Sequence, residues 1–289
     1  MKLIIAEKPS VAKSIALALG ASSKGDGCYE GNGLIVSWCL GHLVSPMDAG
    51  RYEERFRKWR FEDLLILPEP FRYERIPDKE DVFQNLKRLM ERSDVHSIVN
   101  ACDAGREGEL IFRLVYHQCH CKKPFERLWI SSMEDSAILE GFENLKPGTE
   151  YDALYEAALC RERADWIVGI NATRLFSTLY GQTLNVGRVM TPTLAMAVMR
   201  EAAISAFKSE PFYTVQLAVD GFTASSERFK KQSEAEALRT ACNGQMAKVT
   251  KAERKEKSEK PPALYDLTSL QRDANRVLGY TAQKKAGWH

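Results

Sequence analysis

Residues 95–113 constrain the fold more strongly than any other stretch of this sequence. Apolar residues, several of them β-branched, lead from Val95 to Cys102, a charged turn follows, and positions 110–116 have the apolar spacing of a helix. This order predicts a buried strand, an acidic turn and a helix. Ligands of open parallel α/β sheets collect just past the carboxyl ends of strands, where the carboxylates of Asp103 and Glu107 are well placed to hold a hard cation against a phosphate. An ordinary solvated turn is the alternative.

The amino terminus repeats this arrangement. A short apolar run at 1–6 ends at Glu7, and residues 11–20 have helical periodicity between Pro9 and Gly20. If the strands at 2–6 and 96–102 are neighbours, Glu7 meets Asp103 and Glu107 in one crevice. Carboxylates grouped so closely repel one another unless a divalent cation or a shared proton relieves them. Alternatively, Glu7 is simply an acid at a helix N-terminus, which the helix dipole favours.

The glycine-rich stretch near the amino terminus does not predict a nucleotide cofactor. The glycines at 25, 27, 31 and 33 match neither the dinucleotide fingerprint nor the P-loop, and no Gly-Lys-Ser/Thr follows them. Residues 28–44 instead predict a hairpin that turns on Gly31-Asn32-Gly33. We expect a structural role for His42, which lies at the end of this stretch.

Composition limits the class of protein. Hydrophobic residues at 44% and charged residues at 28% of 289 positions are typical of a globular protein with about two or three domains. A net charge of +2 is no nucleic-acid signature by itself, so any basic surface must be local. The seven cysteines are scattered and no signal peptide precedes them, which predicts reduced thiols in a cytoplasmic protein. No apolar run reaches membrane-spanning length, so we expect no membrane partner.

Two stretches mix features that are typical of nucleic-acid surfaces. Residues 51–75 alternate basic and aromatic types, which suits either a base-stacking surface or a solvated loop with aromatic anchors. Residues 151–180 predict one long helix with arginine and asparagine on one broad side. Such a face can bind several phosphates. The alternative is an ordinary surface helix whose arginines pair with Glu162 or Asp165.

The other segments predict short elements. We expect a strand over 125–132, a helix over 135–145 and a boundary between domains at 146–149. The His-x-Cys-His-Cys group at 117–121 has no second ligand pair nearby, so an accidental cluster is favoured over a zinc site. Further on we expect a helix through Arg200, a hairpin on Asp220-Gly221, a helix at 233–243, an exposed strand edge and linker at 248–260, and a helical region at 264–286.

Taken in order, these motifs resemble those of the type IA DNA topoisomerases. Ile4–Ser10 together with Asp103–Glu109 is similar to the Toprim domain of that family. The resemblance continues through Arg161–Arg174, Asn185–Leu194 and Pro261–Leu270, so it covers nearly the whole chain, and bacterial topoisomerase III is the most similar branch. It implies an α/β Toprim domain with a mostly parallel sheet flanked by helices at 1–147, a helical DNA-binding domain at 148–210, a small β-containing segment at 211–262 and the truncated start of the tyrosine-bearing helical domain at 263–289.

The resemblance also implies an activity. Enzymes of this family cleave one DNA strand through a 5′-phosphotyrosine without ATP, pass another strand and religate, and so relax or decatenate DNA. The implied partner is single-stranded or negatively supercoiled DNA at the nucleoid. It implies that Glu7, Asp103 and Glu107 bind Mg²⁺ and handle protons at the scissile phosphate. Lys8 would contact that phosphate as a point charge, and Arg106 would pair with a carboxylate. The implied DNA-binding residues are Trp59, Arg161, Arg163, Asn171, Arg174, Asn185, Val186, Gly187, Arg188, Val189 and Met190; of these, Gly187 permits close approach of a strand and Arg188 suits a bidentate phosphate contact.

The sequence departs from the family pattern at three points. The acidic turn usually reads Asp-x-Asp-x-Glu, but Gly105 replaces the second Asp, which should weaken a divalent site. Glu109 is expected either to compensate or to cap the following helix. Met190 stands where Gln is usual. The Thr-Tyr-Pro-Arg-Thr-like motif that carries the nucleophile is absent.

From the missing motif we expect an amino-terminal part of a longer enzyme, which binds single-stranded DNA weakly and does not relax supercoils unaided. Two alternatives stay open at this point. One is a catalytically dead module that binds single-stranded DNA, and the other is a different Toprim enzyme, such as a nuclease or primase.

Overall fold

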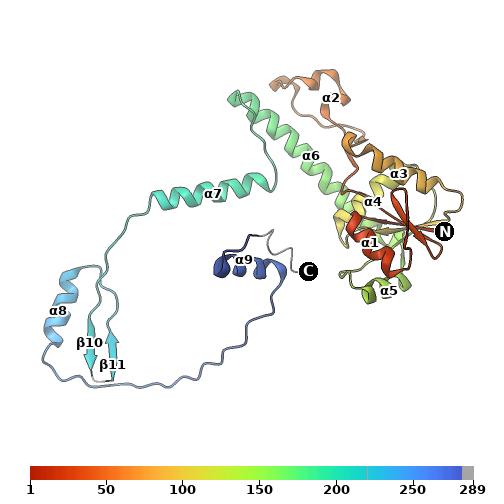
Figure 1. Cartoon of the computed structure of the whole chain (residues 1–289). Coiled ribbons are helices and arrows are strands. Elements are labelled where there is room, and N and C mark those ends of the chain that lie inside the picture. The colour runs from red at the N-terminus through yellow and green to blue at the C-terminus, as the bar shows by residue number, and fades with distance from the viewer. Residues whose placement is uncertain (220, 282–289) are drawn as a thin grey trace. The chain divides into compact units, whose positions relative to one another are not determined.

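The first compact unit, Met1–Phe207, is built on a seven-stranded sheet (Figure 1). The computed structural model describes residues 1–219 and 221–281 of the chain. The strand order is β2-β3-β4-β1-β7-β8-β9, in which β4, β1, β7 and β8 are parallel and the flanking strands are antiparallel. The strands are β1 (Lys2–Ala6), β2 (Ser23–Gly25), β3 (Cys28–Gly31), β4 (Leu34–Trp38), β7 (Ser97–Ala101), β8 (Phe125–Arg127) and β9 (Lys146–Pro147).

Helices cover both faces of this sheet. Leu3 and Ile5 belong to a buried cluster with residues of α3 (Glu80–Glu91) and α4 (Arg106–Gln118). Ile4 and Ala6 belong to a second cluster with residues of α1 (Pro9–Ala18) and α5 (Asp135–Glu143). Successive side chains of one strand thus enter opposite layers, as the geometry of a strand requires. The predicted α/β class, a mostly parallel sheet flanked by helices and followed by a helical region, is confirmed.

The sequence patterns predicted most of these elements and missed some of their limits. The neighbour relation between the first strand and the strand before the acidic turn is confirmed, since Ala6 of β1 lies opposite Ala101 of β7. The strand predicted over 125–132 was too long, because β8 ends at Arg127, opposite Asn100, where its partner β7 is about to end. Lys146 and Pro147, expected between two domains, form the edge strand β9.

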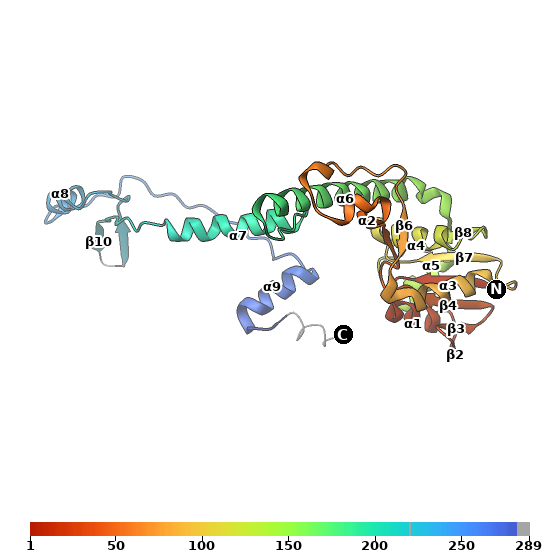
Figure 2. The ribbon, with the colours of Figure 1, turned by 90° about the horizontal axis from the view of Figure 1, so that it is seen from above.

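A long helix and the segment at 48–72 form the second part of this unit. The helix α6 (Asp152–Tyr180) runs for 29 residues, and α2 (Ala49–Tyr52) lies beside it (Figure 2). Phe56 and Ile66 of the segment are buried and pack with Trp166 and Ile170 of α6. The remaining elements of the unit are β5 (Val44–Pro46), β6 (Tyr73–Arg75), α7 (Met190–Ser205) and the 3₁₀ turns η1 (Glu54–Arg57), η2 (Phe61–Asp63), η3 (Pro77–Lys79) and η4 (Gly148–Tyr151).

The second compact unit spans Lys208–His289. It contains the hairpin of β10 (Gln216–Val219) and β11 (Phe222–Ser225), then α8 (Gln232–Cys242) and α9 (Leu267–Leu278). The hairpin and both helices were predicted, although Asp220 and residues 282–286 of those predictions lie outside the described residues. Residues 248–260 form no strand, contrary to the expected strand edge. Within 1–219 and 221–281, no helix is long and apolar enough to cross a membrane.

Candidate functional site

The candidate site lies at the carboxyl ends of β1 and β7. Because Ala6 and Ala101 are paired, Glu7 and Asp103 leave the sheet side by side. The backbone N–H of Asp103 donates a hydrogen bond to Oε2 of Glu7 over 3.3 Å. The ammonium of Lys8 lies 3.9 Å from Oδ2 of Asp103. Two acids and one lysine therefore meet at one edge of the sheet, with the lysine and aspartate side chains about half exposed.

Glu107 and His42 form a second pair at this edge. Glu107 lies in the first turn of α4, and its Oε2 is 3.5 Å from Nε2 of His42, which follows β4. His42 was not predicted to lie at the acidic turn; its position after β4, which pairs with β1, was the available signal. The structure thus adds an imidazole to the site.

The donor set suits a hard cation without forming a closed cage. Among residues 1–219 and 221–281, no three His, Cys, Asp or Glu side chains are gathered as a metal-binding group. The predicted ligands Glu7, Asp103 and Glu107 are thus not collected around one point. Mg²⁺, however, commonly uses one or two carboxylates and completes its shell with water and substrate phosphate. Glu7 and Asp103, joined by the hydrogen bond above, fit that requirement.

Two expectations for the acidic turn were wrong. Arg106 is exposed and makes no ion pair with a carboxylate in the described part of the chain. Glu109 is fully buried and lies 2.8 Å from Nε of Arg113 and 3.0 Å from Nε of Arg127. It points into the protein, so it neither supplements the exposed carboxylates nor caps α4. The spacing of Glu109 and Arg113, four residues apart on an apolar helix, was the available signal for this burial.

A pocket of about 250 Å³ joins the acidic turn to α6. Glu107 and His42 line one part of it, and Arg161 and Arg188 line another. Two of the predicted DNA-binding arginines therefore lie beside a predicted catalytic acid. The other charged lining residues are Glu162 and Asp165.

The pKa values of Glu162 and Asp165 in this pocket are shifted in opposite directions. Nε of Arg188 lies 2.8 Å from Oδ1 of Asp165, and this hydrogen bond lowers the pKa of Asp165. Burial raises the pKa of Glu162. Asp165 is thus the counter-charge of Arg188, and a bound phosphate would compete with it for that guanidinium.

Asn171 and Arg174, which are predicted to bind DNA, hold the segment at 48–72 against α6. The Asn171 amide accepts a hydrogen bond from the Ile66 N–H over 2.7 Å and donates to the Ile66 carbonyl over 2.9 Å. Arg174 donates to the Phe56 carbonyl over 2.7 Å, and its guanidinium lies 5.4 Å from the ring centre of Trp59. Both side chains are buried. Trp59 itself is 44% exposed, so its ring is accessible to a ligand while the guanidinium of Arg174 lies against it.

The other predicted DNA-binding residues differ in exposure. Arg163 is half-buried, with its guanidinium 5.5 Å from the ring centre of Phe71. Val186 is tied to α6, because its N–H donates to the Thr173 hydroxyl over 2.9 Å. Gly187 is half-buried, and its N–H donates to the Thr191 hydroxyl. The exposed members are Asn185, Arg188, Val189 and Met190.

Two family models and several known proteins match this chain. Residues 2–133 match the family model of the Toprim domain, and residues 149–288 match the model described as DNA topoisomerase. The chain is 45% identical to DNA topoisomerase 3 of Bacillus subtilis (strain 168) and 43% identical to DNA topoisomerase 3 of Shouchella clausii (strain KSM-K16). Each match covers 98% of this chain and 40% of the relative, so the chain spans about 40% of the length of these curated relatives.

A solved structure agrees on the fold. Full-length topoisomerase I from Thermotoga maritima has a TM-score of 0.68 to this chain at 24% identity, over 98% of this chain and 45% of that one. The match to the DNA topoisomerase model beyond the Toprim region argues against a nuclease or primase that shares only the Toprim domain.

Proposed function

Since the chain belongs to the family of type IA DNA topoisomerases, we propose that it provides the acidic, phosphate-binding half of a centre that cleaves and reseals single DNA strands. The observation that carries this proposal is the meeting of Glu7, Lys8 and Asp103 past the carboxyl ends of two adjacent parallel strands. An exposed lysine beside the Asp103 carboxylate suits a phosphodiester that must be held while charge shifts between its oxygens. The ranges 1–147, 148–210, 211–262 and 263–289 stay our proposal for its domains.

In the proposed reaction a tyrosine hydroxyl oxygen attacks the scissile phosphorus. The hydroxyl loses its proton as a phosphotyrosine bond forms at the 5′ end, the bond to the 3′ oxygen breaks, and that oxygen takes up a proton; religation is the reverse. Lys8 would offset negative charge on the phosphate, and Glu7 would move a proton at the 3′ oxygen. Glu7 and Asp103, with Glu107 nearby, would hold Mg²⁺. When bound, Mg²⁺ would supply further neutralisation of phosphate charge.

This sequence contains no Thr-Tyr-Pro-Arg-Thr-like motif, which is the motif that carries the nucleophile in the family. We therefore propose that this chain with Mg²⁺ leaves a negatively supercoiled plasmid unrelaxed. Strand cleavage is expected when the chain is mixed with a polypeptide carrying the remaining part of a curated relative, and Glu7→Gln should abolish it. Relaxation by this chain alone would refute the proposal that another polypeptide must supply the tyrosine. Failure of the mixture to cleave would refute the proposal that this chain supplies catalytic residues.

Single-stranded DNA at the nucleoid, in the cytoplasm, is the proposed substrate. Trp59, beside the basic residues of the 48–72 segment, suits base stacking, and Arg161 and Arg188 suit phosphates next to Glu107. Trp59→Ala should weaken binding of a fluorescent oligonucleotide by about 1–3 kcal/mol, the usual contribution of one stacked base. Trp129→Ala is a matched control, because Trp129 is also 44% exposed but lies outside this segment. Equal binding of the oligonucleotide by the two variants would show that Trp59 is not part of the DNA-binding surface.

A catalytically dead module that binds single-stranded DNA is the second candidate. Two observations favour it: Gly105 stands where the family usually has an acid, and the described residues gather no three-ligand metal group. In that case the mixture described above binds DNA and never cleaves it.

A further inference from the structure

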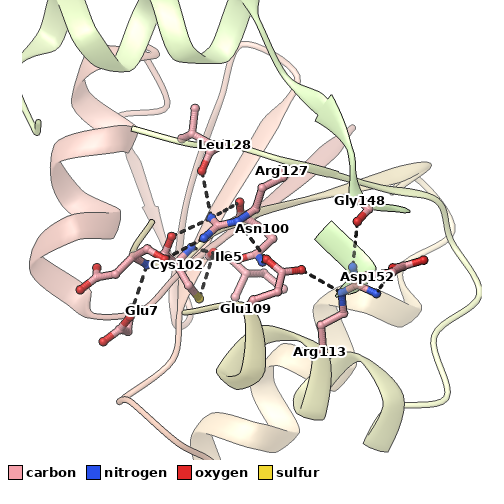
Figure 3. Close-up of polar contacts among 11 residues, drawn as sticks. Ile5, Glu7, Asn100, Cys102, Glu109, Arg113, Arg127, Leu128, Gly148 and Asp152 are labelled. Atoms are coloured by element: carbon pink, nitrogen blue, oxygen red, sulfur yellow. Dashed lines mark hydrogen bonds and ion pairs between the residues drawn. The ribbon is translucent and has the colours of Figure 1, made fainter. Parts of the chain in front are cut away.

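A cluster of buried charge lies directly beneath the acidic turn (Figure 3). Glu109 and Arg127 are 0% exposed and Arg113 is 6% exposed. Charged side chains are almost never buried so completely unless they are paired. The three residues come from α4 and β8, the elements that follow and flank the turn, so their contacts bear on how the turn is held.

Arg127 binds the backbone of the turn itself. Its two terminal nitrogens donate to the carbonyls of Asn100 (3.0 Å), Cys102 (2.7 Å) and Asp103 (2.7 Å), and also to that of Leu128 (2.9 Å). Cys102 and Asp103 lie past the end of β7, where their carbonyls have no partner strand, and here one planar guanidinium satisfies both. A side chain of β8 therefore helps to set the path of the chain from the end of β7 to Asp103.

Gly108 closes the opposite side of Asp103. A Cβ atom at position 108 would lie 2.1 Å from the carbonyl oxygen of Asp103 and 2.8 Å from its nitrogen. Real Cβ contacts are never that short, so only glycine allows the first turn of α4 to approach this closely. The Asp103 backbone is thus held between the Arg127 guanidinium and the backbone of α4.

Glu109 supplies the counter-charge and a further link. Its Oε2 lies 3.0 Å from Nε of Arg127 and accepts a hydrogen bond from the Asn100 amide over 3.0 Å. The other end of that amide accepts from the Cys102 N–H over 3.1 Å. Burial lowers the pKa of Arg127, and the charge of the nearby Glu109 carboxylate opposes that shift. Arg113 shares the carboxylate but turns away, donating to Gly148 and Asp152.

We propose that Arg127 and Glu109 are positioning residues that set the Asp103 carboxylate beside Glu7, so that the affinity of the chain for a divalent cation depends on them. The inference rests on the proposed function, in which Glu7 and Asp103 hold the cation. Groups that orient metal ligands typically change metal affinity by about 10–100-fold when they are replaced. The dependence should be strong here, because Gly105 leaves the site with few carboxylates.

The test is Mn²⁺ binding to the whole chain, followed by electron paramagnetic resonance, together with amide hydrogen exchange in the metal-free chain. Arg127→Lys keeps the charge, but one ammonium cannot reach all of these carbonyls. We expect it to weaken Mn²⁺ binding at least about tenfold and to speed exchange of the Asp103 amide. Arg113→Lys is the matched control: it alters the same ion cluster without touching the turn, and we expect Mn²⁺ affinity within about twofold of the parent.

Four outcomes decide whether Arg127 and Glu109 position the turn. Unchanged Mn²⁺ affinity in a folded Arg127→Lys variant overturns the inference, and so does an equal loss in Arg113→Lys, since the effect would then be a general loosening. If Arg127→Lys does not fold, Gly108→Ala displaces Asp103 while leaving every buried charge in place, and the same loss of affinity is expected. If the parent chain binds no Mn²⁺, the proposed metal site fails, and exchange at Asp103 alone then decides whether Arg127 positions the turn.

Discussion

Replacing Gly105 with aspartate tests how far the missing carboxylate limits this site. The position accepts a side chain, since a Cβ atom there would meet nothing within 4 Å and the backbone is extended, with φ 174° and ψ 178°. Gly105→Asp therefore adds one negative charge to the acidic turn without a steric penalty. Any change in metal affinity can then be assigned to charge.

The expected gain follows from Coulomb's law. Two unit charges about 4 Å apart attract by about 1 kcal/mol in bulk water, and a divalent cation doubles this to about 2 kcal/mol. Salt at about 0.1 M screens part of the attraction at an exposed site. We expect a net gain of about 1.4 kcal/mol, which is about tenfold in affinity. Isothermal calorimetry with Mg²⁺, at fixed ionic strength, measures it directly.

Gly105→Asn is the control for this experiment. Gly105 is the N-cap residue of α4 and makes no side-chain cap, so either Asp or Asn improves capping by about a few tenths of a kcal/mol. Both variants should melt slightly above the parent, but only Gly105→Asp should bind Mg²⁺ more tightly. Equal affinities for Gly105→Asp, Gly105→Asn and the parent would refute the reasoning that carboxylate number limits the site.

Two further predictions concern α6. Asn171→Ala leaves the buried Ile66 backbone groups unpaired and should lower the free energy of unfolding by about 1–3 kcal/mol, whereas Asn185→Ala, at an exposed position, should leave it unchanged; urea denaturation distinguishes the two. For Glu162, burial raises the folded pKa above the unfolded one, so the wild-type chain loses stability as pH rises through the folded pKa. Glu162→Gln should therefore stabilise the chain at about pH 7.5 but not at about pH 4, below the usual pKa of a glutamate, and an equal effect at both values would contradict this.

Local sequence patterns predicted the elements around the site well. Pro9 and Gly20 punctuate α1, and the apolar run before Asp103 defines β7, because both signals depend on neighbours in sequence. The pairing of β1 with β7 is a contact across about ninety residues of chain, which periodicity could suggest but not establish. Once that pairing is given, the meeting of Glu7 with Asp103 follows.

The buried polar contacts could not be predicted in the same way. A charged residue in a sequence predicts exposure, so no local pattern indicated that Arg127 is buried. The helical spacing of Asn171 and Arg174 identified a face of α6, but not that the 48–72 segment would dock on it and use both side chains. Which partner a polar group finds is decided by tertiary packing, and one sequence carries no local record of it.

The length of α6 and the ion pair at its first residue affect how far its far end can move. With 29 residues at about 1.5 Å each, this helix is a lever about 43 Å long. Its first residue, Asp152, is held by the same Arg113 that pairs with Glu109 beneath the acidic turn. A tilt of about 5° about this first residue would displace the far end by about 4 Å, given the length of the helix. A small change of angle at the first residue of α6 would thus produce a larger displacement at its far end. Trp59, whose ring contacts Arg174 of α6, would move with the helix.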